Sequence, residues 1–545
     1  MPKSERGILG YRKVPGKEIL FSFAPRKGNE CASDEEDSDY QPSDDEEGLS
    51  RNKDRKSALG KSKEKKQRNV KQRKKQAKNK QKGEIMKRKR NMVIDSSQSE
   101  SPSKRFQKED ASMPSKSGHQ LWGQMLPIEI LVRVFELGVR ENGAVPFLCR
   151  VSRVCSLWRE AASKPSLWHH IDLSFGWVKS IEQTLNILLE NRVSRLKILN
   201  LSLCAKLTDK EIKLVVDKCP LLESINLTAC IKLTSLSISL LSSGCQHLKA
   251  VDLSGLNIGA VAPAVLKQLV EQCGSRLEEF VIAKTQLRSF PMVLKALMTC
   301  CPNLKLLDLS NCKFSSDFLM IPIEEFQAGC PSLEVLRLTG SKVRANQVSR
   351  RLKEESLGFP KLKELSVAVN ITTTLNISLG ITDGLLLRLL KTSSKLKHLD
   401  LRGCTHITAD VLQKLSLDNL EQLFISQCSV SKYEGIAVIV QKWMHSLIEL
   451  DLSWNVFPGM SLDIAMKKLS STPQKSNLRI LNLSGTSITA QRVKSLLDGC
   501  PRLSCLDLSS CRGLPRGMKQ QYEGERLANL KRNIDTIFDE ESENT

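Results

Sequence analysis

The sequence predicts an α/β solenoid of repeated strand–helix units, preceded by a short helical segment and a long charged tail. Three observations support this fold class. The pattern L-x-x-L-x-L-x-x-C returns about twelve times after residue 193. The stretch before it, from Leu126 to Trp168, carries apolar residues at helical spacing. Residues 1–118 contain few apolar and many charged residues, so we expect them to be disordered because they cannot bury enough surface to fold.

The composition and the charge distribution indicate in which cellular compartment the protein is expected. The chain has 545 residues and a formal net charge of +23. Much of that charge lies in one block, since Arg51 to Arg90 holds 20 lysines and arginines against 3 acidic residues. The opening residues, MPKSERGILGYRK, lack the apolar core of a secretory signal, and no apolar run approaches the roughly 18 residues of a membrane span. We therefore expect an intracellular, reducing compartment, free thiols and no membrane partner.

Two blocks of opposite charge divide the tail. Glu30 to Glu47 contains ten acidic residues and no basic one. Ser33 and Ser43 precede acidic runs in this block and resemble acidophilic, casein-kinase-two-type phosphorylation sites. The basic block contains the runs Lys71–Lys75 and Lys87–Arg90, which are typical of nuclear import signals or nucleic-acid patches. We expect a nuclear protein, with the cytoplasm as the alternative.

The basic block leaves other interpretations open. No aromatic residue interrupts Arg51 to Arg90, so the stacking of single-stranded bases is not predicted. Any nucleic-acid binding there would be non-specific contact with phosphates, which weakens with salt. Alternatively, the block is a solvated segment that the acidic block attracts.

The segment from Leu126 to Trp168 predicts three short helices. The first two each place apolar residues on one face: Ile130, Leu131, Val134 and Phe135 in the first, and Val151, Val154, Cys155 and Trp158 in the second. Pro146 suits the first turn of the second helix. Ser163 is the predicted cap of a third short turn that carries Leu167 and Trp168. So small a unit seldom stabilises itself, so it needs a partner or the array behind it.

These residues resemble an F-box. The resemblance lies in Leu126-Pro127, Glu129-Ile130-Leu131, Phe135, Val154-Cys155-x-x-Trp158 and Leu167-Trp168. The segment Gly138 to Val145 departs from the family because we expect there a loop longer than the commonest form. The resemblance implies that residues 120–172 bind a Skp-type adaptor and, through it, a cullin and a RING protein. The implied adaptor contacts are Leu126, Pro127, Ile130, Leu131, Val134, Phe135, Val151, Val154, Cys155, Trp158, Leu167 and Trp168. The alternative is a helical cap on the repeats, whose apolar face is only core.

The repeats occupy residues 193–512. Clear copies are CPLLESINLTAC (Cys219–Cys230), CPNLKLLDLSNC (Cys301–Cys312) and CPRLSCLDLSSC (Cys500–Cys511). The copies start at anchor leucines, most of them 24 to 31 residues apart: Leu196, Leu222, Leu248, Leu277, Leu304, Leu333, Leu362, Leu396, Leu420, Leu447, Leu478 and Leu503. This spacing is close to the period of leucine-rich repeats, roughly 20–29 residues. The cysteine form resembles the cysteine-containing subclass found in F-box proteins.

The alternation of apolar residues predicts how each repeat folds. The third and fifth residues after an anchor, such as Leu307 and Leu309, are apolar in nearly every copy and alternate as in a strand. Segments between the strands, such as DKEIKLVVDKC, have helical spacing. Stacking of neighbours buries what one unit cannot bury alone. We therefore predict an α/β horseshoe, followed over residues 513–545 by a cap helix and a disordered end, DEESENT.

The cysteines fill two fixed places in the repeats, where small buried thiols suit the packing. The last motif position holds Cys204, Cys230, Cys312, Cys404, Cys428 and Cys511, and the end of the preceding helix holds Cys219, Cys245, Cys301, Cys330 and Cys500. The clustered cysteines and histidines of a zinc site are missing from the sequence, so we predict no metal and no cofactor. A nucleophile elbow, a phosphate loop and an HExxH motif are missing too, so we expect a non-catalytic protein.

The residue four positions after each anchor should point out of the concave side. It is Asn or Asp in most copies, as expected of a solvated consensus position. Departures mark the candidate substrate contacts: Arg337 and Phe424 at this position, His398 and Arg402 beside Asp400, and Trp454 after its strand. The longest spacing, between Leu362 and Leu396, contains VAVNITTTLNISLGIT, a second candidate for recognition.

Together, the two resemblances imply a substrate-recognition component of an SCF-type E3 ubiquitin ligase. The F-box would hold the adaptor and the repeats an unknown protein substrate, which raises the local concentration of target lysines. One alternative is a nuclear or nucleolar scaffold that uses the basic tail for RNA and the repeats for a protein partner. Another is a repeat protein that inhibits one enzyme, which leaves the F-box resemblance unexplained.

Overall fold

The computed structural model describes residues 126–174, 180–257, 262–316, 318–369, 381–428, 435–471 and 476–542. The chain divides into two units, Met1–Pro114 and Ser115–Thr545, and every described residue belongs to the second. The predictions for the charged tail therefore lie outside the described residues. So does most of the insertion between Leu362 and Leu396, because residues 370–380 are not described.

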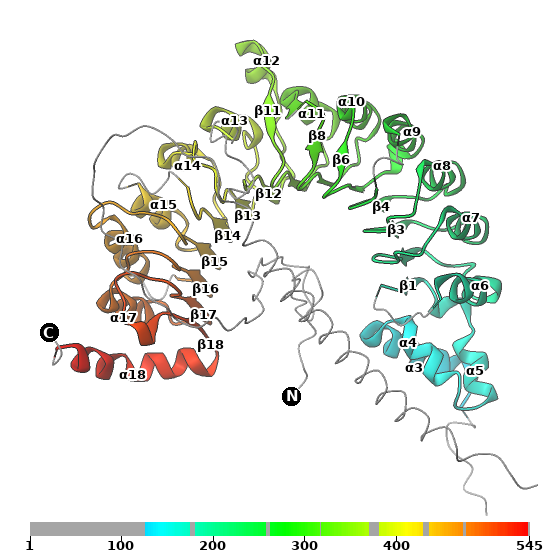
Figure 1. Ribbon diagram of the computed structural model, residues 1–545, viewed down its shortest axis with the longest axis horizontal. Coiled ribbons are helices and arrows are strands. Elements are labelled where there is room, and N and C mark those ends of the chain that lie inside the picture. Colours follow the sequence, from blue (N-terminus) through cyan, green and yellow to red (C-terminus); the bar gives the residue numbers. More distant parts are fainter. Residues whose placement is uncertain are drawn as a thin grey trace, which may run out of the picture. The chain divides into compact units, whose positions relative to one another are not determined.

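One sheet of fourteen short strands runs through the second unit (Figure 1). Its strands, in spatial order, are β1 (His170–Asp172), β2 (Ile198–Asn200), β3 (Ser224–Asn226), β4 (Ala250–Asp252), β5 (Glu279–Val281), β7 (Leu306–Asp308), β10 (Val335–Arg337), β12 (Glu364–Ser366), β13 (His398–Asp400), β14 (Gln422–Phe424), β15 (Glu449–Asp451), β16 (Ile480–Asn482), β17 (Cys505–Asp507) and β18 (Gln521–Glu523). Neighbouring strands are parallel, with Leu307 opposite Leu336 for example. Only β18 is antiparallel to its neighbour. The twelve predicted repeats supply β2 to β17, and β1 and β18 extend the sheet at its two ends.

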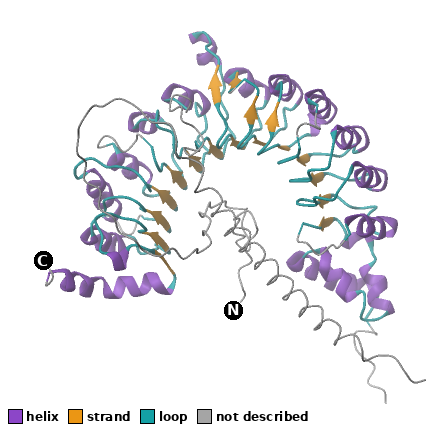
Figure 2. Ribbon diagram, in the orientation of Figure 1, coloured by secondary structure: helices purple, strands orange, loops and turns teal. Residues whose placement is uncertain are grey.

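Helices cover the outer side of the sheet, and the strands line the inner side (Figure 2). The repeat helices are α6 (Ile181–Asn191), α7 (Asp209–Lys218), α8 (Ser235–Gly244), α9 (Pro263–Cys273), α10 (Phe290–Cys300), α11 (Ile323–Gly329), α12 (Arg350–Glu355), α13 (Asp383–Leu389), α14 (Ala409–Lys414), α15 (Ile436–Trp443), α16 (Ser461–Ser470) and α17 (Ala490–Gly499). Hydroxyl side chains begin several of them. Thr208 and Glu211 form a capping box at α7, for example. The predicted α/β leucine-rich-repeat solenoid is confirmed.

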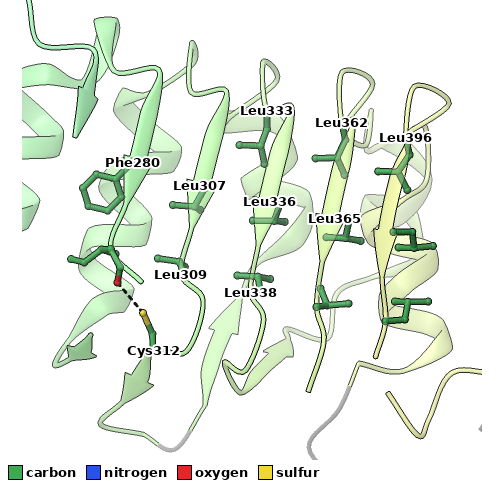
Figure 3. Close-up of a cluster of buried hydrophobic side chains, with 14 of the residues drawn as sticks. Phe280, Leu307, Leu309, Cys312, Leu333, Leu336, Leu338, Leu362, Leu365 and Leu396 are labelled. Atoms are coloured by element: carbon green, nitrogen blue, oxygen red, sulfur yellow. Dashed lines mark hydrogen bonds between the residues drawn. The ribbon is translucent and has the colours of Figure 1, made fainter. Parts of the chain in front are cut away.

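The core is a stack of leucines between the strands and the helices. In Figure 3 the anchors Leu333, Leu362 and Leu396 lie at one end of their strands, and Leu336 and Leu338 follow along the same side. All five are at most 2% exposed. Each buried leucine contributes roughly 1.5–3 kcal/mol relative to an exposed one. Of the twelve anchors only Leu503 is partly exposed, so burial accounts for the repeat pattern.

In several repeats the last motif residue forms a hydrogen bond to the repeat before it. The thiol of Cys312 donates a hydrogen bond to the Ile282 carbonyl oxygen at 3.1 Å (Figure 3). Four more thiols make the same bond, from Cys230, Cys404, Cys428 and Cys511 to Leu201, Val367, Leu401 and Leu483. Asn455 takes this place in the β15 repeat, where its amide donates to the Ile425 carbonyl oxygen at 2.9 Å. These bonds satisfy buried carbonyl groups between neighbouring repeats.

The loops that follow three strands form short parallel pairs of their own. One pair joins β6 (Gln286–Leu287) to β8 (Lys313–Phe314), and the other joins β9 (Leu319–Ile321) to β11 (Val343–Ala345). These pairs were not predictable from the sequence, because two or three residues carry too little alternation to indicate a strand.

The carboxyl-terminal end of the sheet is capped. A 3-10 turn (Arg516–Met518) precedes β18, and α18 (Glu525–Ser542) follows it. Leu527, Leu530 and Ile534 of α18 are buried, which confirms the predicted cap helix. The prediction of a disordered DEESENT is wrong for its first part, since α18 continues through Ser542.

Three further sequence predictions concern the state of the cysteines, membrane-spanning helices and metal ligands. Every described cysteine is a free thiol. Among the described residues, no helix has the length and apolarity that crossing a membrane requires. In the same part of the chain, no three His, Cys, Asp or Glu side chains lie close enough to hold a metal ion.

We expect the replacement Cys312→Ala to lower the free energy of unfolding by about 1–3 kcal/mol. The change removes a buried hydrogen bond and leaves a small void. Urea denaturation followed by circular dichroism measures the loss. The matched control is Cys300→Ala, at a half-buried thiol at the end of the preceding helix α10, which should change stability by less. Equal losses for the two variants would show that the thiol bond is not important.

The buried thiols also predict a dependence of stability on pH. Burial raises the pKa of Cys230, Cys312 and Cys428 to about 12, from an ordinary value of 9.0. Below pH 9 the thiols are protonated in both states. Above it the unfolded chain loses protons that the folded chain keeps, so stability falls as pH rises from 9 toward 12. The urea midpoint should therefore be lower at pH 10.5 than at pH 8, and an unchanged midpoint contradicts the prediction.

Candidate functional site

Three short helices and a 3-10 turn precede the sheet. They are α3 (Ile128–Asn142), α4 (Ala144–Val151), α5 (Ser156–Ala162) and a turn at Pro165–Leu167. The predicted long loop over Gly138 to Val145 is wrong. Helix α3 continues to Asn142 and ends at Gly143, whose φ is +77°. Helix α4 starts at Ala144, and within it only Val145 departs from helical geometry.

The predicted second helix is two helices. α4 ends at Val151 and α5 begins at Ser156, so Val151 and Trp158 do not share one helix. Cys155 lies at the break and caps α5, with its sulfur accepting the Trp158 backbone N–H at 3.5 Å. Ser163 is not the cap of a third turn. It ends α5, where its hydroxyl donates to the Arg159 carbonyl oxygen at 2.7 Å.

An aromatic cluster holds these helices together. The Phe135 ring meets Trp158 edge-on at 5.3 Å and Phe147 edge-on at 6.0 Å between centroids. Gly138 allows this packing, because a Cβ there would overlap the Phe147 ring. Trp168 is fully buried, and its indole N–H donates to the Ala162 carbonyl oxygen at 2.8 Å.

The implied adaptor contacts divide by burial into three groups. Leu131, Phe135, Leu167 and Trp168 are core; Leu126, Val151, Cys155 and Trp158 are partly buried; and Pro127, Ile130, Val134 and Val154 are exposed. The buried four hold the segment together and do not present a surface. The exposed four remain candidates for direct contact.

The outer side of α3 is apolar although it faces solvent. Ile130, Val134 and Leu137 follow one another at i, i+4 and i+7, and 50%, 49% and 57% of their surfaces are exposed. Leu137 was not among the residues implied by the sequence, although its spacing from Ile130 was visible. We call these three residues the α3 face. Contiguous exposed apolar residues on a helix are typical of a surface that a partner covers.

On the concave side, most Asn and Asp residues at the fourth position have a structural role. Each accepts a hydrogen bond from the backbone N–H two residues further on, at 2.8–3.2 Å. The eight are Asn200, Asn226, Asp252, Asp308, Asp400, Asp451, Asn482 and Asp507. Such bonds fix the turn that follows each strand. The consensus residues therefore shape the repeat, which leaves the departures as candidates for recognition.

Arg337 lies between two carboxylates of neighbouring strands. Its guanidinium donates to Glu364 at 2.5 and 3.0 Å, and it lies 3.7 Å from Asp308. Burial raises the pKa of the Asp308 carboxyl. The guanidinium therefore joins β7, β10 and β12 across the concave face.

Three other candidates come together on β13 and β14. The Arg402 guanidinium binds both oxygens of Asp400, at 2.9 and 2.7 Å, and lies 5.3 Å above the Phe424 ring. The His398 ring lies 5.1 Å from the same ring. Phe424 is only 5% exposed, so its prediction as an exposed anchor is wrong. Packing between neighbouring repeats decides this burial, and one repeat's sequence does not reveal it.

Trp454 is the exposed aromatic residue among the candidates. It follows β15, has φ +57° and is 55% exposed. Its ring packs against Gly485 of the next repeat, where a Cβ would lie 2.6 Å from the ring. Arg337 lies apart from the His398–Arg402–Phe424 cluster, because its strand β10 is two strands away from β13, whereas Trp454 follows β15, the neighbour of β14.

Family models match both parts of this arrangement. Residues 124–174 match a model described as F-box-like. Residues 303–326 and 392–416 match two leucine-rich-repeat models. The chain carries an F-box-like region followed by leucine-rich repeats. These matches support the F-box and leucine-rich-repeat resemblance.

Comparison with curated proteins gave no match. Among solved structures, the chain is similar to a complex of Rad7 and Elc1 in yeast, with 17% identity, a TM-score of 0.40 and coverage of 72% of this chain and 91% of that one. It is also similar to a TLR13–ssRNA13 complex, with 18% identity, a TM-score of 0.34 and coverage of 59% of this chain and 44% of that one. The leucine-rich-repeat protein LegL7 from Legionella pneumophila shows 15% identity, a TM-score of 0.33 and coverage of 67% of this chain and 97% of its own. Scores this low support no argument about function.

Core and surface residues of the F-box-like region should respond differently to truncation. Phe135→Ala removes the centre of the aromatic cluster and should destabilise this region by about 3–5 kcal/mol. Ile130→Ala, one turn away on the α3 face, should change stability by less than about 0.5 kcal/mol. Hydrogen exchange of the α3 and α5 amides measures both. A large loss for Ile130→Ala would mean that the α3 face is core.

Proposed function

We propose that this protein is the substrate-recognition component of an SCF-type E3 ubiquitin ligase. The observation that carries the proposal is the α3 face. It is an exposed apolar helix surface within a region that matches the F-box-like model, directly followed by leucine-rich repeats. F-box regions bind Skp-type adaptors, and such adaptors connect to a cullin and a RING protein.

In this proposal the α3 face and the nearby Pro127 and Val154 bind the adaptor. Burial of apolar side chains would supply most of the affinity, since a few buried anchors dominate most interfaces. The first strand of the sheet, β1, begins two residues after Trp168. The short connection would hold the repeats, and any protein bound to them, close to the ligase. The architecture is typical of non-catalytic subunits. Such a subunit would act by holding the bound protein close to the ligase, which raises the local concentration of target lysines.

The repeats would bind the substrate through departures from their consensus. The candidates on or beside the strands are His398 and Arg402, which pack on the buried Phe424, and the exposed Trp454; Arg337 is a further one. Arginine and tryptophan are the side chains most often found as interface anchors. The substrate is a protein whose identity these residues do not specify.

The tail supports a nuclear location in this proposal, because Lys71–Lys75 and Lys87–Arg90 are typical of import signals. The same basic block favours the second candidate, a nuclear or nucleolar scaffold that binds RNA non-specifically. Removal of residues 1–118 separates the two. The scaffold role is favoured if RNA binding and the cellular role are lost while adaptor binding persists, and the ligase role is favoured if the cellular role persists together with adaptor binding.

The adaptor contact is tested with Ile130→Glu combined with Val134→Glu in the full chain. Placing two carboxylates on the α3 face should reduce co-purification of a Skp-type adaptor by at least about a hundredfold, because buried unpaired charges are costly. The control is Ile187→Glu, at an exposed isoleucine of α6, which should bind normally. The pair Leu126→Ala and Pro127→Ala should also abolish binding while the repeats stay folded.

Adaptor binding that persists in both double variants would refute the assignment. A positive result leads to the substrate. With cullin modification blocked, proteins that bind both the wild type and the Ile130→Glu, Val134→Glu variant are candidates. Those ubiquitinated only with the wild type, once the block is lifted, are substrates.

A further inference from the structure

The two ends of the strands carry charge in different ways. The residue directly after each anchor precedes its strand and is charged in nine consecutive repeats: Lys197, Glu223, Lys249, Glu278, Lys305, Glu334, Lys363, Lys397 and Glu421. We call these nine the salt-bridge row. Every one of its lysines pairs with a glutamate of a neighbouring repeat, at 2.5–2.9 Å. This end of the sheet is nearly neutral.

A second row of lysines lies beyond the opposite end of the strands. Lys206, Lys232, Lys284, Lys313 and Lys342 occupy the loops after β2, β3, β5, β7 and β10. We call these five the lysine row. Figure 3 shows the geometry: the anchor leucines mark one end of the strands, and Cys312, which Lys313 follows, lies past the other.

The lysine row is not neutralised. Within the described part of the chain, none of its five side chains takes part in an ion pair or hydrogen bond. Four of them are exposed and Lys342 is half-buried. The stretches that carry them, residues 201–207, 227–233, 282–288, 309–316 and 338–348, contain no Asp or Glu, and Asp317 follows the fourth stretch in the sequence. Two arginines, Arg288 and Arg344, add to the charge there.

Backbone bonds hold neighbouring loops side by side. The Leu203 N–H donates to the Thr228 carbonyl oxygen at 2.7 Å, and the Lys284 N–H donates to the Ser310 carbonyl oxygen at the same distance. The β6–β8 pair brings Gln286 opposite Lys313. The lysines therefore project from a fixed surface, so less conformational entropy is lost when it binds a partner.

Exposed aliphatic residues accompany the charges. Leu203 precedes Lys206 by three residues, and Ile231 precedes Lys232 directly; about half of each side chain's surface is exposed. Met320 of β9 is a third. A nucleic acid offers phosphates to the lysines but no aliphatic groups to cover these side chains. A protein segment that alternates acidic and aliphatic residues matches both features.

We propose that the lysine row and its aliphatic neighbours form a docking surface for an acidic, aliphatic-containing segment of a partner protein. The surface is separate from the α3 face and from the concave-face candidates, so the proposal stands whether or not the chain binds a ligase adaptor. A single exposed ion pair contributes little. Five in a row, with burial of Leu203 and Ile231, produce a specific site whose affinity falls as salt rises.

The test compares two full-length variants with equal changes in charge. The first replaces the five lysines of the lysine row with glutamine: K206Q, K232Q, K284Q, K313Q and K342Q. The matched control replaces five lysines of the salt-bridge row: K197Q, K249Q, K305Q, K363Q and K397Q. Both are made in a chain whose runs Lys71–Lys75 and Lys87–Arg90 have glutamine for lysine and arginine, because these runs would also bind the probe.

The probe is a labelled peptide in which glutamates alternate with leucines, and fluorescence anisotropy gives Kd. The lysine-row variant should raise Kd at least about tenfold, given the usual strength of several exposed ion pairs. The control, which leaves glutamates unpaired, should change Kd by less than about threefold. Thermal unfolding confirms that both variants are folded.

Three results would overturn the proposal. Equal losses in the two variants would mean that total charge, and not the row, decides binding. A peptide of glutamates alone that binds as tightly would remove the role of the aliphatic residues. An oligonucleotide that displaces the peptide at equal concentration of charge would replace the protein partner with a nucleic acid.

Discussion

The structure depends on one constraint, the parallel register between successive strands of three residues. So short a strand has few backbone hydrogen bonds of its own, and leucines stacked behind the sheet stabilise it. Two polar devices complete many of the junctions. A fourth-position Asn or Asp closes the turn after eight of the strands. In six repeats a cysteine thiol or the Asn455 amide at the last motif position donates to a carbonyl group of the preceding repeat. Side chains at equivalent positions then form rows across the repeats, as the salt-bridge row shows.

Rows create surfaces that no single repeat contains. The same register that pairs Lys305 with Glu278 places Arg337 between Asp308 and Glu364, and it brings Arg402 and His398 against Phe424. The F-box-like region is stabilised differently. Its aromatic cluster around Phe135 gives it a core of its own, and the α3 face remains exposed to solvent. One chain therefore presents a helical surface and a set of row surfaces, each with a different chemistry.

Burial explains what was predictable from the sequence. The leucine spacing of the repeats is set by the core, so the fold class, the strand positions and the cap helix could be predicted. The F-box-like helices were less predictable. A glycine usually weakens a helix, yet Gly138 lies inside α3 because Phe147 needs the space. The burial of Phe424 depends on residues from neighbouring repeats, and the pairing of the lysines depends on register. Neither can be read from one repeat, so the sequence could name these residues but not say which were exposed.

The thiols of the last motif position have a consequence for the chain under oxidative conditions. Oxidants react with the thiolate form of cysteine, and burial keeps groups such as Cys312 and Cys428 protonated at any physiological pH. A sulfur atom thus serves here as an inert hydrogen-bond donor. Peroxide that modifies accessible cysteines would therefore leave the junctions made by these buried thiols intact.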